Sequence, residues 1–164
     1  MAFFTGRTGA LYLRGPLTGG TTPSASQQAL KLRDWSLETT LELLETTTVD
    51  TAVKSYTPGS VSATGSATVL YYRREGTTST EPGVQFEQFL NKIMKTSNSG
   101  VTESDRVGMI LRVGTTPGSG SDVKDDIVFN AYITNASIQV STGELTSVAI
   151  QFTVDGRFLE LIDS

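Results

Sequence analysis

Apolar and polar residues alternate along much of the chain, which is the pattern of β-strands that bury one face. Between residues 30 and 45 the alternation changes parity: it begins with Leu30 and Leu32 and continues with Trp35, Leu37, Leu41 and Leu43. A change of parity inside one strand indicates a β-bulge, here near residues 33–34. Glu38 and Glu42 lie on the opposite face of this strand, where we expect water rather than a core.

Four further segments have strand periodicity. Residues 61–71 alternate small apolar residues with Ser and Thr, and apolar residues recur at every second position in residues 107–113 and 127–133. Residues 138–140 and 148–154 flank the turn sequence Ser141-Thr-Gly-Glu144, which predicts a β-hairpin. The chain is therefore expected to be mainly β and antiparallel.

One segment has helical periodicity instead. Its apolar residues recur at spacings of three and four, at Phe86, Phe89, Leu90, Ile93 and Met94. Pro82 precedes this run, and Ser97-Asn-Ser-Gly100 follows it. These signals predict a single α-helix over about residues 83–96.

Two segments have few apolar residues. Residues 1–28 are rich in Gly, Thr, Ser and Pro, and are expected to form an extended N-terminal arm. Residues 46–58 are expected to form a long loop, and loops of this length are often functional. The 164 residues as a whole are expected to form a single domain, 1–164.

Composition excludes most catalytic chemistry. The sequence contains no Cys and no His, so it has neither a thiol nucleophile nor the commonest general base and metal ligand. It contains 25 Thr and 17 Ser, which favour strands and turns. A net charge of −4 argues against tight binding of nucleic acid, which depends on Lys and Arg.

The remaining candidate sites are weak. Gly118-Ser-Gly-Ser121 lacks the spacing of a phosphate-binding loop, and Asp122, Asp125 and Asp126 lack the spacing of a calcium loop. Glu38 and Glu42 are about 13 Å apart along a strand, farther than the roughly 5–9.5 Å between the carboxylates of glycosidases. We therefore expect no catalytic residues, no metal, no cofactor and no enzyme activity. A signal peptide and an apolar span are not recognisable, so no membrane insertion by this chain is expected.

Several segments in succession resemble the tail tube (major tail) proteins of tailed bacteriophages. They are Trp35-Ser-Leu-Glu-Thr-Thr40, Lys54-Ser-Tyr-Thr-Pro-Gly59, the small-residue strand of residues 62–72 and the hairpin of residues 137–145 with Phe152. The resemblance implies an antiparallel β-sandwich or split barrel with one flanking helix. It also implies that six copies form a hexameric ring, each adding four strands to a shared inner β-barrel, and that rings stack into a hollow tube for genome ejection.

The resemblance also assigns roles to residues. Glu38 and Glu42 are expected to face the lumen, where carboxylates would repel DNA during its passage. The loop 46–58 corresponds to the family's inter-ring stacking loop, with contacts expected from Val49, Asp50, Val53, Lys54 and Tyr56.

The implied partners are further copies of the chain, a tape measure protein in the lumen, a tail terminator, and baseplate or tail-tip proteins. A sheath protein would be added in a contractile tail, and double-stranded DNA would pass transiently and without specificity. The implied location is the virion tail, assembled in the host cytoplasm.

Two alternatives remain open. One is a tube or hub protein of a related contractile injection or secretion system, which would share the fold. The other is a soluble β-sandwich binding module, which would require a ligand pocket with clustered aromatic residues. The scattered Tyr56, Tyr71, Tyr72 and Tyr132 give this second alternative little support.

Overall fold

The computed structural model describes residues 9–15, 32–50, 52–70 and 90–161. These residues form six β-strands and one short 3-10 helix, Glu103–Asp105. The strands are β1 (Ala10–Arg14), β2 (Leu32–Glu45), β3 (Tyr56–Leu70), β4 (Val107–Thr116), β5 (Val123–Gln139) and β6 (Ser147–Leu161). No helix within the described residues is long and apolar enough to cross a membrane.

All six strands belong to one antiparallel sheet with the order β1-β4-β5-β6-β3-β2. The sheet is open, because its edge strands β1 and β2 do not pair with each other in the described structure. The mainly β, antiparallel class predicted from the sequence is confirmed. The finer prediction of a sandwich or split barrel with a flanking helix is not confirmed: the described strands form a single, strongly bent sheet that is not closed into a barrel.

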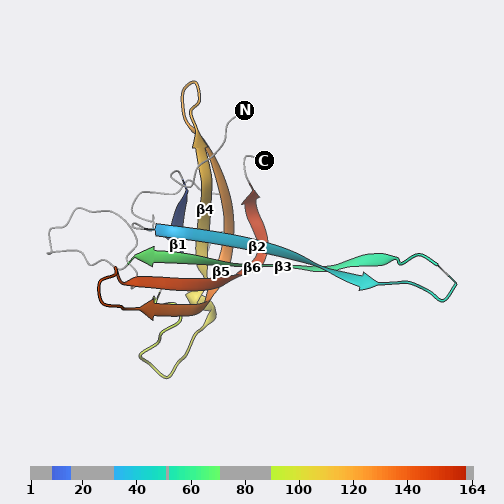
Figure 1. Cartoon of the computed structure of the whole chain (residues 1–164), viewed down its shortest axis with the longest axis horizontal. Coiled ribbons are helices and arrows are strands. Elements are labelled where there is room, and N and C mark those ends of the chain that lie inside the picture. Colours follow the sequence, from blue (N-terminus) through green and yellow to red (C-terminus); the bar gives the residue numbers. More distant parts are fainter. Residues whose placement is uncertain (1–8, 16–31, 51, 71–89, 162–164) are drawn as a thin grey trace.

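The bend divides the sheet into two halves, and β5 and β6 take part in both (Figure 1). The compact half contains β1, β4, residues 123–131 of β5 and residues 154–161 of β6. The extended half contains β2, β3, residues 147–153 of β6 and residues 134–139 of β5. In Figure 1 the strands of the compact half run steeply across those of the extended half.

The apolar faces of the two halves form one core. Leu11, Met109 and Phe129 of the compact half are fully buried in the same cluster as Ile150 and Phe152 of the extended half. The rings of Phe129 and Phe152 stack with centroids 5.7 Å apart. The bend thus lets one sheet bury its own apolar face.

The corner of the sheet lies in β6. Asn130 pairs with Asp155, whereas Val128 pairs with Glu160, so β6 has extra residues between these two pairs. Gly156 lies within that insertion with φ +80, a conformation that glycine adopts without strain. Arg106 Nη1 donates a hydrogen bond to Asp155 Oδ2 at 3.0 Å and anchors the corner to the segment before β4.

The opposite face of the compact half holds a buried ion pair. Arg112 of β4 donates two hydrogen bonds to the carboxylate of Asp126 on β5, at 2.8 and 2.9 Å, and a third to the hydroxyl of Tyr12 on β1. The hydrogen bonding of the guanidinium to the Asp126 carboxylate is the main reason that the pKa of Arg112 is raised. Three strands are thereby joined through one guanidinium group.

The strand predictions agree closely with this structure. A register shift between Leu32 and Asp34 is the bulge that the parity change predicted. The predicted hairpin is present, with its turn at residues 141–144 between β5 and β6.

Two predicted segments have different outcomes. Most of the predicted helix 83–96 lies outside the described residues, and its last part contains two turn-forming backbone hydrogen bonds, from Ile93 N–H and Met94 N–H to Leu90 O. Most of the predicted arm 1–28 also lies outside them. Ala10–Arg14 differs from that prediction, because it forms the buried strand β1 paired with β4. Leu11 and Leu13 of this strand belong to the buried core. The short apolar run was not recognised as a strand because the sequence around it is rich in Gly and Thr.

Candidate functional site

The extended half has one face made almost entirely of small polar side chains. Its pairings place Ser36, Thr64 and Ser66 on this face, together with Gln151 of β6 and Asn135 of β5. Ser36 and Ser66 share a hydrogen bond of 2.9 Å between their hydroxyl groups. We call this surface, opposite the core, the polar face.

The polar face carries a row of carboxylates, and the strands of the extended half contain one cationic residue, Arg33, at the bulge that begins β2. Asp34 pairs with Thr68 and Glu38 pairs with Thr64, so both acidic residues lie on this face. Glu42 follows on the same side, where its Oε2 accepts a hydrogen bond of 2.9 Å from Ser60. The segments 34–45, 56–70, 134–139 and 147–153 contain no Lys or Arg. The three carboxylates are spaced by four residues, about 13 Å along the strand.

Sequence reasoning placed Glu38 and Glu42 on this face but missed Asp34. The bulge at residues 32–34 made the orientation of Asp34 ambiguous, because its parity depends on where the extra residue sits. Asp34, Glu38 and Glu42 recur at every fourth position, and this spacing could have indicated that Asp34 lies on the same face.

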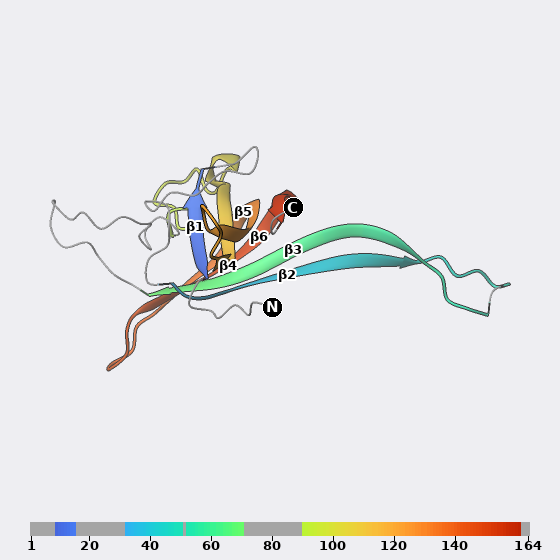
Figure 2. The same ribbon diagram turned by 90° about the horizontal axis from the view of Figure 1, so that it is seen from above.

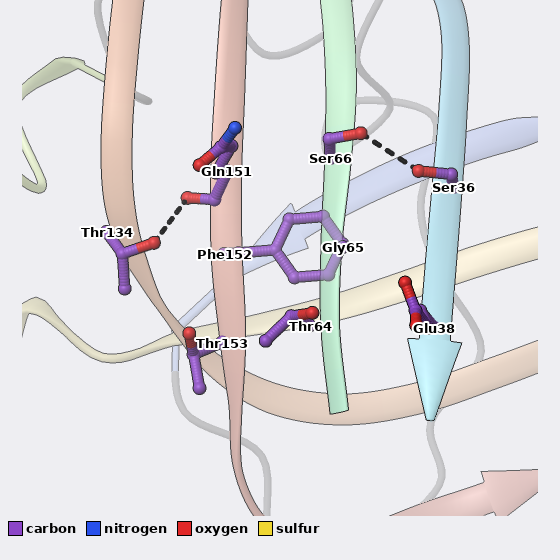
Figure 3. Close-up of a pocket in the computed structure, with 9 residues that line it drawn as sticks. All are labelled: Ser36, Glu38, Thr64, Gly65, Ser66, Thr134, Gln151, Phe152 and Thr153. Atoms are coloured by element: carbon purple, nitrogen blue, oxygen red, sulfur yellow. Dashed lines mark hydrogen bonds between the residues drawn. The ribbon is translucent and has the colours of Figure 1, made fainter. Parts of the chain in front are cut away.

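A polar cavity of about 340 Å³ lies on this face, lined by residues that include Glu38, Ser66 and Gln151. Figure 3 shows Ser36 and Ser66 joined across β2 and β3, with the ring of Phe152 over Gly65 on the neighbouring strand. A Cβ atom at Gly65 would lie 2.5 Å from Phe152 Cζ and 2.4 Å from the carbonyl oxygen of Ser36. Glycine is therefore required where the core aromatic crosses β3.

The β2–β3 hairpin extends far beyond the rest of the molecule (Figure 2). We call its end, residues 46–50 and 52–55, the tip. Thr46 N–H donates to Ser55 O at 2.8 Å, and Lys54 Nζ lies 3.8 Å from Glu45 Oε2. Val49 and Val53 are exposed, and Asp50 lies between them in sequence. Tyr56 is the first residue of β3 rather than part of a loop, and it is also exposed.

The apolar stripe of β2 continues past the end of the core. Trp35 and Leu37 pack against the core cluster, but Leu41 and Leu43 on the same strand are 48 % and 55 % exposed. Val61, the partner of Leu41, is 64 % exposed. An apolar stripe of this kind is typical of an interaction surface.

Both edges of the extended half are unpaired in the described structure. No described strand pairs with the outer edge of β2, and β4 pairs with β5 only as far as Ala131. The residues of β5 beyond that point have one neighbour, β6. Unpaired edges beside an open sheet are sites where another chain can add strands.

The described residues contain no group of three or more acidic side chains placed to hold a metal ion. The candidate site therefore consists of four surface features: a polar face, an exposed apolar stripe, two unpaired edges and a projecting tip.

No family model and no curated protein sequence matches this chain. Solved structures do match it. The SPP1 tail tube structure is similar over 97 % of this chain and 79 % of that chain, with a TM-score of 0.63 and 12 % identity. The tail of an empty gene transfer agent particle, refined with C6 symmetry, is similar over 90 % and 92 % of the two chains, with a TM-score of 0.54 and 14 % identity. The six-fold symmetrised baseplate of the anti-feeding prophage is similar over 97 % of both chains, with a TM-score of 0.58 and 10 % identity.

At these identities the similarity concerns the fold and not individual residues. This chain has the fold found in the SPP1 tail tube, gene transfer agent tail and anti-feeding prophage baseplate structures. The resemblance to tail tube proteins that the sequence indicated is confirmed at the level of the fold.

Proposed function

We propose that this chain is the structural subunit of a phage tail tube, in which hexameric rings stack into a hollow conduit for genome ejection. The observation that carries the proposal is the extended half: four strands with two unpaired edges in the described structure and an acidic polar face, on strands that contain no Lys or Arg beyond the bulge at residues 32–34. The fold shared with tail structures supports the same function.

Strand direction supports closure into a ring. Every pair in the extended half is antiparallel, so its edge strands β2 and β5 run in opposite directions. If β2 of one copy lies beside β5 of the next, the antiparallel alternation continues across the boundary. Six copies then close a shared inner barrel and leave no exposed edges.

The polar face then lines the lumen. Asp34, Glu38 and Glu42 of six copies would form repeated acidic rows that repel the phosphates of DNA. Ser and Thr between them keep the wall hydrated without charge. DNA would pass close to this wall without being held.

The apolar stripe of Leu41, Leu43 and Val61 faces away from the lumen in this arrangement. Because the chain's own core ends before these residues, a neighbouring subunit would cover them. The tip, with Val49, Asp50, Val53, Lys54 and Tyr56 in and beside it, would contact the adjacent ring.

The remaining partners follow from this function. A tape measure protein would occupy the lumen during assembly, and tail terminator and baseplate or tail-tip proteins would meet the tube ends. A sheath would surround the tube in a contractile tail. The subunit would be assembled in the host cytoplasm, belong to the virion tail and act without enzyme activity.

A tube or hub protein of a contractile injection system is the second candidate. The similarity to the anti-feeding prophage baseplate over 97 % of both chains favours it specifically. Neighbouring genes would separate the two candidates, because a phage locus would also encode capsid and terminase proteins. The binding-module alternative lacks the clustered aromatic residues it requires, because none of the described cavities is lined by more than one aromatic side chain.

Negative-stain electron microscopy of the purified protein at increasing concentration tests the proposal. We expect rings or tubes with a stain-filled lumen. A chain that stays a monodisperse monomer, even with tail-tip components added, would contradict it.

The lumen assignment has its own test. Glu38→Ala with Glu42→Ala is expected to leave tube assembly intact and to alter DNA passage, measured as ejection from particles that contain the variant. Loss of tubes in this variant would show that the two residues are interface residues instead.

A further inference from the structure

A cationic cavity lies at the end of the compact half where β1 ends and β4 begins. It has a volume of about 400 Å³ and is lined by Leu13, Arg14, Gly15, Asn91 and Lys92. Two of these residues are cationic, although the whole chain has a net charge of −4. We call this cavity the basic cavity.

The segment before β4 forms one wall of the basic cavity and is held in place by its own contacts. Lys95 Nζ donates to Asn91 O at 2.7 Å and forms an ion pair with Asp105. Asp105 is buried and also accepts a hydrogen bond of 2.9 Å from Thr102 N–H. Because Lys95 already compensates this carboxylate, Arg14 and Lys92 leave the cavity cationic.

The β4–β5 hairpin forms the opposite end of the compact half. Its loop, residues 117–122, consists of Pro, Gly and Ser followed by a single charged residue, Asp122, which is exposed. Gly120 N–H donates to Gly118 O at 2.9 Å, so the loop closes on itself. The hairpin therefore presents a carboxylate beside small side chains, which allow another surface to approach closely.

The two ends of the compact half lie on opposite sides of the extended half. Val113, near the hairpin end of β4, lines a cavity together with Trp35 of β2. At the other end, Arg106 is bonded to Asp155 at the corner, where β5 passes into the extended half. Figure 1 shows the β4–β5 hairpin projecting beyond β2, with the segment before β4 on the side of β5.

The two ends of one chain cannot meet, because the 10 residues of β4 between them span roughly 33 Å at the rise of a strand. In the proposed ring, however, β2 of one subunit lies beside β5 of the next. The hairpin that projects beyond β2 then extends toward the basic cavity of the neighbour. Figure 2 shows the compact half on one side of the extended half, so the compact halves of neighbouring subunits lie in one outer layer.

We propose that the β4–β5 hairpin of each subunit docks in the basic cavity of its neighbour in the same ring; this inference rests on the proposed tube function. Asp122 pairs with Lys92 and Arg14 of the neighbour. Hairpin and cavity are different surfaces of identical chains, so the contact is heterologous and closes when the ring closes. It gives the outer layer its own closed set of contacts, in addition to the strand pairing of the inner barrel.

Charge reversal tests the ion pair. Asp122→Lys and Lys92→Glu are each expected to raise the protein concentration at which rings form by at least about tenfold, because a ring repeats the weakened contact in every subunit. The double variant is expected to form rings more readily than either single variant, since the two charges are again opposite. Sedimentation velocity over a concentration series measures ring formation.

Two controls accompany the charge reversals. Glu144→Lys changes the net charge by the same amount in the exposed turn between β5 and β6, and it should leave ring formation unchanged. Thermal unfolding of Asp122→Lys should match that of the wild type, because Asp122 is exposed. A defect in ring formation at unchanged stability then reports a lost contact between subunits.

Cysteine cross-linking tests the contact directly, because the sequence contains no native Cys. With an added oxidant, Asp122→Cys with Asn91→Cys is expected to give a covalent ladder that ends at six chains on a denaturing gel. Asp122→Cys alone, or with Val140→Cys at the far end of β5, is expected to give dimers at most. A ladder that continues beyond six chains would show that the contact joins rings, and would overturn the proposal.

The remaining outcomes separate this contact from the proposed function. Wild-type rings or tubes that give no ladder, together with single charge reversals that form rings like the wild type, would overturn the hairpin contact and leave the tube function standing. A wild-type chain that forms neither rings nor tubes would overturn the proposed function and this contact together.

Discussion

The compact and extended halves of the same sheet differ in how far their apolar side chains are buried. In the compact half, Leu11, Met109 and Leu111 are fully buried. In the outer part of the extended half, Leu41, Leu43 and Val61 remain about half exposed. The compact half thus completes its core within one chain, whereas the extended half leaves its apolar stripe open.

This difference in burial predicts that the two halves contribute differently to the stability of the folded chain and to its assembly. Residues of the compact half should determine whether the chain folds, because burial of apolar surface drives folding. Residues of the projecting hairpin should determine whether folded chains associate, because in the proposed tube they are buried only by a second copy. Substitutions of the same chemical kind in the two halves should therefore have different effects.

The largest expected effect is at the buried ion pair of the compact half. Asp126→Ala leaves the guanidinium of Arg112 buried without its carboxylate partner, which should lower the free energy of unfolding by about 3–5 kcal/mol. Urea unfolding followed by circular dichroism measures the change. Asp122→Ala, an exposed carboxylate nearby in sequence, is the control and should change it by less than about 0.5 kcal/mol. Equal stabilities of the two variants would contradict the role of the pair.

The next effect compares one substitution in both halves. Leu111→Ala creates a cavity in the core and should cost about 2–5 kcal/mol of unfolding free energy. Leu43→Ala should cost less than about 0.5 kcal/mol in the monomer, because the side chain is already exposed. The assembly readout should be reversed, with Leu43→Ala impairing rings and tubes at concentrations where the wild type forms them. An assembly defect that simply followed monomer stability would remove the distinction between the halves.

A smaller effect is expected where the two halves meet. Gly65→Ala introduces a Cβ within 2.5 Å of two neighbours, one of them backbone, and should destabilise the fold by about 1–3 kcal/mol. Gly59→Ala in the same strand meets only the flexible side chain of Glu42, at 3.1–3.3 Å, and should be nearly neutral. Thermal unfolding of both variants checks this expectation. A neutral Gly65→Ala would mean that Phe152 does not pack over β3 as described.

The smallest effect concerns pH. The hydrogen bond from Lys95, followed by that from the Thr102 amide, lowers the pKa of Asp105 below its ordinary value of 3.8. A lowered carboxyl pKa adds stability that is present above the ordinary value and is lost as pH falls through the lowered value. Thermal unfolding between pH 7 and pH 2.5 should therefore show a steeper acid decline for the wild type than for Asp105→Asn. Parallel declines would contradict this contribution.

Individual strands could be predicted from the sequence because their determinants are local. The parity change before Trp35 located the bulge, and Ser141–Glu144 located the hairpin turn. The same alternation placed Glu38 and Glu42 opposite the apolar stripe. Ala10–Arg14 could not be recognised as a strand, because five residues within a Gly- and Thr-rich segment gain their structure from pairing with β4.

The sequence by itself determined the β class, the two faces of each strand and the absence of Cys and His chemistry, because these depend on composition and on a period of two. Only the tertiary structure decided that one bent sheet buries its own core, that Asp34 joins the acidic row and that the β2–β3 hairpin projects beyond that core. The physical reason is that strand pairing and bending depend on contacts between residues far apart in the chain. Alternation records which face a residue occupies, but not which strand lies beside it.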